Sequence, residues 1–228
     1  MPHEPQTLQE AFTIGGPLMW PLLGASVVGL AVVVERFAVY ASQRLPFDGF
    51  VDGLCDAVRS GDDARARAMT EGQRSPLARL ARHFLDAQDR PRARREELLK
   101  REGDVLLTNV ERRLPILRLV VQVAPILGLL GTVHGLLFAF WGLEAVDGPI
   151  KPSDVAGGIG SALTTTVFGL SIAIPASAFL LLFEEKVERT ARRMGFLVSR
   201  LEEALTEAEG AKPVASVEGQ HAVDKQAG

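Results

Sequence analysis

Apolar residues gather into three long runs, at residues 17–40, 119–143 and 155–183, and most charged residues lie between and after these runs. A helix rises about 1.5 Å per residue, so about 20 apolar residues match the roughly 30 Å hydrocarbon core of a membrane. Each run reaches that length. The pattern therefore predicts an all-α integral membrane protein with three transmembrane helices.

Lys and Arg residues are spread unevenly around the runs, with none in residues 1–16, fifteen in 41–115, one in 144–154 and seven after residue 183. Loops rich in these residues stay in the cytoplasm. We therefore expect the N-terminus and the 144–154 loop to lie outside the cytoplasm, and the 41–115 segment and the C-terminal tail inside it. Because residues 1–16 contain no basic residue, we expect no cleavable signal peptide there.

The segments outside the runs also have helical patterns, which predict long cytoplasmic helical extensions. Short helices are expected at residues 50–59, 62–69 and 76–87, the last capped by Ser75, and a longer one at 92–114 with a kink at Pro115. Past the third run, apolar residues recur every three or four positions as far as Leu205, and this apolar seam needs a partner. The predicted parts, in order, are an extracytoplasmic N-terminus (1–16), transmembrane helix 1 (17–40), a cytoplasmic helical domain (41–115), transmembrane helix 2 (116–143), an extracytoplasmic loop (144–154), transmembrane helix 3 (155–183), a cytoplasmic helix (184–209) and a disordered tail (210–228).

Composition and charge argue against several classes of function. The formal net charge of −3 is too small to indicate nucleic-acid binding. Cys55 is the single cysteine, and no Cys/His spacing indicates a metal site. We also find no nucleophile with a base at a usable spacing and no phosphate-binding loop, so we expect neither an enzyme nor a cofactor.

Small residues recur at steps of three or four in the second and third runs. Such residues let helix backbones approach closely within a membrane, so we expect these stripes to pack helices together and to serve oligomerisation. Pro125 and Pro175 are expected to shape the two helices. The stripes are Ala124, Gly128, Gly131, Gly135, Ala139 and Gly142 in the second run, and Gly158, Ala162, Thr165, Gly169, Ala173 and Ala176 in the third.

Hydroxyl side chains crowd the same two runs, at depths where bulk water is absent. Such side chains either bond to carbonyls of their own helix or line a narrow, hydrated passage. For Thr132 and Thr166 we favour the pore, and we add Thr165, Ser161 and His134 to the candidate proton pathway. For His134 two interpretations stay open, titration in the pathway and a satisfied polar side chain at a helix interface.

Two stretches carry a family resemblance. Residues 124–135 (APILGLLGTVHG) resemble the second-helix signature of the ExbB/TolQ family. Residues 158–170 (GIGSALTTTVFGL) and 173–176 (AIPA) resemble its third-helix signature. Glu35-Arg36-Phe37 at the end of the first run is also similar to that family. The chain is thus identified as resembling the ExbB/TolQ/MotA proton channel family, in the order, spacing and orientation of all three predicted spans.

The resemblance implies a homo-pentameric ring in the bacterial inner membrane, around two copies of a single-span ExbD/TolR-like partner that carries the titrating Asp. The function implied is that of a proton-channel and stator subunit, which couples the proton motive force to motion or force in the partner. By position, Thr132 and Thr166 correspond to the family's pore threonines. Ser161 stands where such proteins usually carry a glutamate, which argues against a carboxylate relay on this chain.

A structural membrane scaffold is the alternative function. In a scaffold, the small stripes and the hydroxyls serve packing alone, without proton conduction. The two hypotheses differ over Thr132→Val and Thr166→Val, which a scaffold should tolerate.

Overall fold

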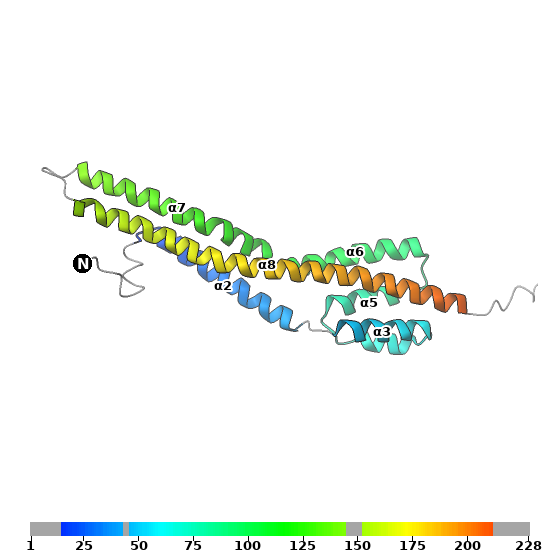
Figure 1. The fold of residues 1–228 in the computed structure, drawn as a ribbon. Coiled ribbons are helices and arrows are strands. Elements are labelled where there is room, and N and C mark those ends of the chain that lie inside the picture. Colours follow the sequence, from blue (N-terminus) through cyan, green and yellow to red (C-terminus); the bar gives the residue numbers. More distant parts are fainter. Residues whose placement is uncertain (1–14, 43–45, 145–151, 212–228) are drawn as a thin grey trace, which may run out of the picture. The chain divides into compact units, whose positions relative to one another are not determined.

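The computed structural model describes residues 15–42, 46–144 and 152–211, and at Glu144, residues 152–155, Ser161 and Ala211 it describes the backbone alone. Within these ranges the chain is helical and has no strand (Figure 1). Most of residues 1–16 and 144–154, and the tail after residue 211 that we expected to be disordered, lie outside the described residues. The helices are α2 (Met19–Ser42), α3 (Phe47–Arg59), α4 (Asp63–Thr70), α5 (Pro76–Asp86), α6 (Arg92–Glu111), α7 (Leu114–Glu144) and α8 (Pro152–Ala211).

Three of these helices are long and apolar enough to cross a membrane. They are α2 over Met19–Ser42, α7 over Leu114–Leu143, and α8, whose candidate range is Ala156–Gly210. The prediction of an all-α chain with three such helices is confirmed. The chain divides into two compact units, with residues 1–41 and 111–186 in the first and residues 42–110 and 187–228 in the second. Helix α8 contributes to both.

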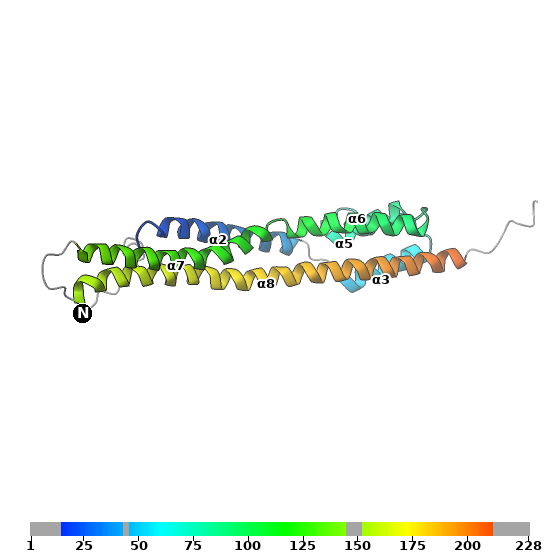
Figure 2. The same ribbon diagram turned by 90° about the horizontal axis from the view of Figure 1, so that it is seen from above.

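In the first unit, α7 and α8 run antiparallel, side by side in both views (Figures 1 and 2). Gly135 of α7 packs against Ala162 of α8, and Gly128 packs against Gly169, so the pairing advances in opposite directions along the two helices. Helix α2 lies against this pair through Gly29, where a Cβ atom would come within 3.2 Å of Val120. These contacts hold three apolar helices together at small residues, as close packing in lipid requires.

The connection into α7 differs from the prediction. We expected one helix over 92–114 with a kink at Pro115, but α6 ends at Glu111 and a separate helix begins at Leu114. Pro115 lies in the first turn of α7, where a missing N–H leaves no helical carbonyl unpaired. Pro115 therefore marks the start of α7 and does not kink a longer helix. Pro125 and Pro175, in contrast, lie inside the continuous helices α7 and α8.

The second unit packs α3, α4, α5 and α6 around the C-terminal part of α8. Its buried core includes Leu54, Phe84, Leu99, Leu197 and Leu201. The apolar seam of α8 therefore finds its partner within the same chain. Of the apolar residues on α6, Leu106 and Val110 are buried, but Val105 is 52% exposed because it lies on another side of the helix.

Local capping fixes the turn between α3 and α4. Gly61 has a φ of +70°, which L-residues rarely adopt. Its N–H donates to the Val58 carbonyl over 3.1 Å, and the next N–H, of Asp62, donates to the Ala57 carbonyl over 3.0 Å. This is the Schellman arrangement that ends helices at glycine. The Asp62 side chain then caps α4 by accepting from the N–H of Arg65, whereas Ser75, predicted to cap α5, makes no side-chain capping bond.

A buried ion pair joins α6 to α8 in the second unit. The Arg95 guanidinium donates to both Glu202 carboxylate oxygens, over 2.6 Å and 2.5 Å. Each side chain is only 7% exposed. Arg95 also donates to the carbonyls of Gln88 and Arg90, and its guanidinium lies over the ring of Phe84. The hydrogen bonds that Arg95 donates to the Glu202 carboxylate raise the pKa of Arg95 above its ordinary value.

Candidate functional site

The two small-residue stripes meet each other along the α7–α8 contact. A Cβ atom on Gly169 would lie 2.6 Å from the Ala124 carbonyl oxygen, and one on Gly128 would lie 3.0 Å from the Thr165 carbonyl oxygen. On Gly158 a Cβ atom would overlap Ala139. These glycines therefore bring α7 and α8 of one chain to backbone contact, a packing within the subunit that their spacing alone could not distinguish from packing between subunits.

Two hydroxyls of α8 converge on one carbonyl of α7. The Thr166 hydroxyl donates to the Gly128 carbonyl over 3.0 Å. The Thr165 hydroxyl lies 3.3 Å from the same oxygen and 2.7 Å from its own Ala162 carbonyl. Thr165 is 1% exposed, and a Cβ atom on Gly131 would collide with its side chain, so Gly131 makes room for it. The structure thus places Thr165 in the helix contact, with Thr166 at its half-buried edge.

Thr132 is positioned differently from Thr166. Its hydroxyl donates to the Leu129 carbonyl of its own helix over 2.6 Å, and the residue is half-buried. Within one chain, the Thr132 and Thr166 hydroxyls bond to different carbonyls and not to each other. In both residues the hydroxyl proton is used by a backbone carbonyl, while the oxygen keeps lone pairs that can accept a hydrogen bond from water or a protonated carboxyl group.

His134 borders a cavity of about 440 Å³ beside the C-terminal half of α7. The imidazole ring lies against Phe138, with ring centroids 4.5 Å apart. Small residues line the same cavity and leave space beside the imidazole; they are Gly135, Ala139 and Gly158. Ser161, one turn before Thr165, lies on the α8 backbone, but its side chain is outside the described residues.

Ion pairs at the other end of the unit were not predicted from the sequence. Arg118 of α7 donates to Glu184 of α8 over 2.8 Å. Glu35 of α2 lies 3.3 Å from Arg113 and 3.1 Å from Arg36. The sequence did contain a signal for the pairing of Arg118 with Glu184. Arg118 directly precedes the second apolar run and Glu184 directly follows the third, and an antiparallel hairpin brings these two ends together.

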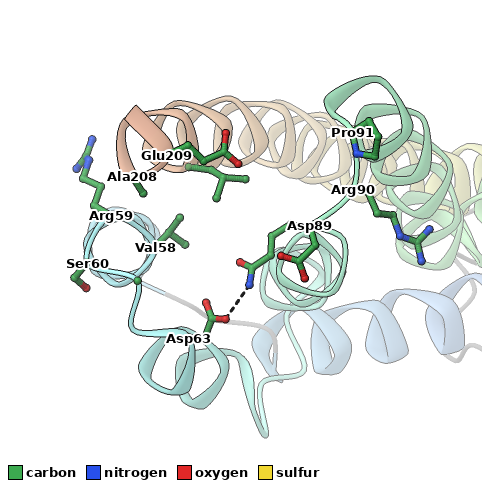
Figure 3. A pocket seen from close by; sticks show the side chains of 12 residues that line it. Val58, Arg59, Ser60, Asp63, Asp89, Arg90, Pro91, Ala208 and Glu209 are labelled. Atoms are coloured by element: carbon green, nitrogen blue, oxygen red, sulfur yellow. Dashed lines mark hydrogen bonds between the residues drawn. The ribbon is translucent and has the colours of Figure 1, made fainter. Parts of the chain in front are cut away.

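A larger hollow, of about 850 Å³, lies in the second unit, outside the predicted spans (Figure 3). Two of its charged lining residues, Arg59 and Asp63, have side-chain partners. Arg59 donates to Glu207 over 2.6 Å, which raises the pKa of the guanidinium. Gln88 donates to Asp63 over 2.8 Å, the bond drawn in Figure 3. We assign no role in proton transfer to this hollow.

The α7–α8 contact offers hydrogen-bonding oxygens without charge. The runs 119–143 and 155–183 contain no Asp, Glu, Lys or Arg. A charged side chain at such depth is costly, whereas a hydroxyl that bonds a carbonyl is tolerated. Chemically, the hydroxyl and carbonyl oxygens of this site can accept hydrogen bonds from a proton carrier, and the two runs supply no carboxylate of their own.

These features define a helical membrane protein whose second and third spans meet at glycines and carry uncharged hydroxyls. Residues 66–195 match the model of the MotA/TolQ/ExbB proton channel family. This match covers more than half of the 228 residues. The chain belongs to this family, and the resemblance predicted from the helix motifs is confirmed.

Named relatives agree with this assignment. The chain is 29% identical over 197 residues to biopolymer transport protein exbB1 of Vibrio cholerae, covering 83% of this chain and 84% of that protein. It is 30% identical over 173 residues to putative biopolymer transport protein ExbB-like 3 of Synechocystis, covering 74% and 81%. A putative ExbB homolog of Methanothermobacter thermautotrophicus is 27% identical over 169 residues, or 74% of this chain, which spans only 60% of that relative's length.

Proposed function

We propose that this chain is the proton-channel and stator subunit of an inner-membrane energy-transducing complex. It couples the proton motive force to motion or force in an ExbD/TolR-like, single-span partner. The observation that carries this proposal is the uncharged, hydroxyl-bearing hairpin of α7 and α8 in a member of a proton channel family. The relatives named biopolymer transport proteins support the assignment to transport.

The titrating group is supplied by the partner. The second and third spans contain no carboxylate or lysine, and Ser161 occupies the position where the family resemblance implies a glutamate. A carboxyl group on a partner helix would release and rebind its proton against the wall of the channel. Thr132 and Thr166 suit that wall, because a hydroxyl can bond to a carboxyl group in either protonation state without binding it as tightly as a full opposite charge would.

Several copies of the chain form the channel, and the resemblance implies five. One chain cannot enclose a pore, since its three membrane-length helices leave most of their apolar surface uncovered. Leu129, Val133 and Phe140 on α7 are 62%, 59% and 60% exposed. Such a broad apolar face suits contact with lipid and with further subunits. We therefore propose a homo-pentameric ring around the partner helices.

The proposed orientation places the N-terminus outside and the C-terminus in the cytoplasm, in a bacterial inner membrane. It rests on the fifteen Lys and Arg residues of the 41–115 segment against none in residues 1–16. The second unit, which carries most of these residues, would then lie on the cytoplasmic side.

Proton flux into liposomes tests the function directly. Vesicles containing the complex with its partner should take up protons under an imposed potential, and Thr132→Val/Thr166→Val should abolish this flux while the complex still assembles. Thr164→Val is the matched control, because Thr164 lies outside the proposed pathway and its hydroxyl, like that of Thr132, donates to its own helix, here to the Gly160 carbonyl over 2.8 Å.

Each result has a distinct meaning for this proposal. Flux that survives the double substitution would refute the wall role and favour the structural scaffold. Flux without any partner would move the titrating group onto this chain, with His134 as the first candidate. An equal loss in Thr164→Val would show that the substitutions act through general destabilisation and not through the wall.

A further inference from the structure

A cavity of about 180 Å³ is lined by residues of α2, α7 and α8, and none of them belongs to the proposed proton pathway. Most of its lining is apolar and includes Leu30, Val33 and Phe179. Two serines interrupt this apolar lining, Ser26 from α2 and Ser171 from α8, and Pro175 of α8 lies beside them. Both serines fall within the predicted membrane spans, so bulk water does not reach them as it would on a soluble protein.

The two serine hydroxyls are unusual for a membrane helix. Serine in such helices normally donates to a carbonyl one turn earlier, as Ser177 does to Ile174 over 2.8 Å. Among the described residues, neither the Ser26 nor the Ser171 hydroxyl makes a hydrogen bond. Two unpaired hydroxyl groups therefore line the same small cavity.

A third polar group reaches the same place through the backbone. Pro175 lies inside α8 and has no N–H, so the carbonyl of Ser171, four residues earlier, lacks its helical donor. Backbone groups freed in this way within a membrane are satisfied by neighbouring side chains or by ordered water. No side-chain donor to this carbonyl is found in the described part of the chain.

We propose that this cavity is a water-binding site within the membrane span, whose ligands are the Ser26 hydroxyl, the Ser171 hydroxyl and the Ser171 carbonyl. An ordered water shielded from bulk solvent needs two to four polar partners, and Ser26 and Ser171, which line this cavity, together offer three. At about 30 Å³ of liquid volume per molecule, a 180 Å³ cavity has room for a small cluster. A lipid acyl chain in the cavity would leave all three groups without partners, an arrangement that costs free energy in hydrocarbon.

The site does not depend on the proposed proton flux and is tested separately, in the full chain with its partner in bilayers. In a Cys55→Ala background, Ser26→Cys and Ser171→Cys each keep two of the three polar groups. Val27→Cys and Ile174→Cys are matched controls on the same helices, at residues that are 60% and 65% exposed on the apolar surface. The probe is methyl methanethiosulfonate, a small neutral reagent that enters membranes and reacts with thiolate, which forms only where water is present.

We expect both serine-site cysteines to react at least about tenfold faster than their controls, because thiolate is scarce in hydrocarbon. Adding Pro175→Ala to Ser26→Cys restores an N–H for the Ser171 carbonyl and should slow the reaction severalfold. Unchanged elution of each variant on size exclusion verifies assembly. Rates equal to the controls would mean a dry cavity filled by lipid or another subunit, and reaction at Ser171→Cys alone would place the water elsewhere. Either outcome overturns the proposal.

Discussion

Replacing Arg95 with methionine should open the second unit, because it leaves the buried Glu202 carboxylate without the only donor that the described residues give it. Removing one partner of a buried ion pair typically costs about 3 to 5 kcal/mol. Glu202→Gln should cost less, about 1 to 3 kcal/mol, since Arg95 keeps the Gln88 and Arg90 carbonyls as acceptors. Arg95→Met/Glu202→Leu removes both charges and should recover most of the loss.

Cys55 provides the assay. It is the single cysteine, it is 0% exposed, and it belongs to the same core as Leu99, one turn after Arg95, and Leu201, next to Glu202. Burial raises the pKa of its thiol, so the folded chain holds little thiolate at neutral pH and should label slowly, and faster as the pH rises. The labelling rate under native conditions then measures how often the second unit opens.

The expected rates follow from these free energies. A cost of 3 to 5 kcal/mol accelerates labelling by about two to three and a half orders of magnitude, up to the rate of an exposed thiol, since 1.4 kcal/mol corresponds to tenfold. Arg92→Met is the control, because Arg92 pairs with Glu96 on the surface, where both side chains are more than half exposed; it should change the rate by less than about fivefold. Labelling of Arg95→Met within threefold of wild type would refute the reasoning, as would equal effects of the two arginine substitutions.

Two further predictions concern the first unit and the membrane. Gly169→Ala should destabilise the α7–α8 hairpin by about 1 to 3 kcal/mol, because the added methyl group collides with the Ala124 carbonyl. Gly160→Ala is the control and should be neutral or slightly stabilising, since a Cβ atom there has nothing within 4 Å. Equal melting temperatures of the two variants in detergent would contradict close packing at Gly169. A tag at the N-terminus should be cleaved by external protease in spheroplasts, and tags at Gln73 and Gly219 should be protected, the reverse pattern refuting the proposed orientation.

The sequence predicted the spans and the small stripes because both depend on local spacing. Apolar length alone locates α2 and α7, and glycines at steps of three or four mark a close approach. The sequence did not reveal which helix the stripes would meet, since packing within and between subunits uses the same residues. Arg95 and Glu202 lie 107 positions apart, and nothing in their local sequence indicates the pairing.

The hydroxyls show the same limit at a finer scale. Thr165 and Thr166 are neighbours, about 100° apart around the helix, and both were candidates for the pore. In the structure Thr165 is buried in the helix contact, while Thr166 lies at its edge. A pattern of residue types cannot separate such neighbours, because the rotation of one helix against the other decides which hydroxyl is buried.

The acceptor for the Thr165 and Thr166 hydroxyls is a backbone atom, the carbonyl oxygen of Gly128. Every amino acid has that carbonyl, so the bond itself places no demand on the side chain at position 128. Only the close approach does, and it favours glycine, since a Cβ atom there would lie 3.0 Å from the Thr165 carbonyl oxygen. Among related sequences we therefore expect each of these positions to be constrained separately, without correlated changes between them, so that a contact central to this hairpin would be missed by methods that infer proximity from paired substitutions.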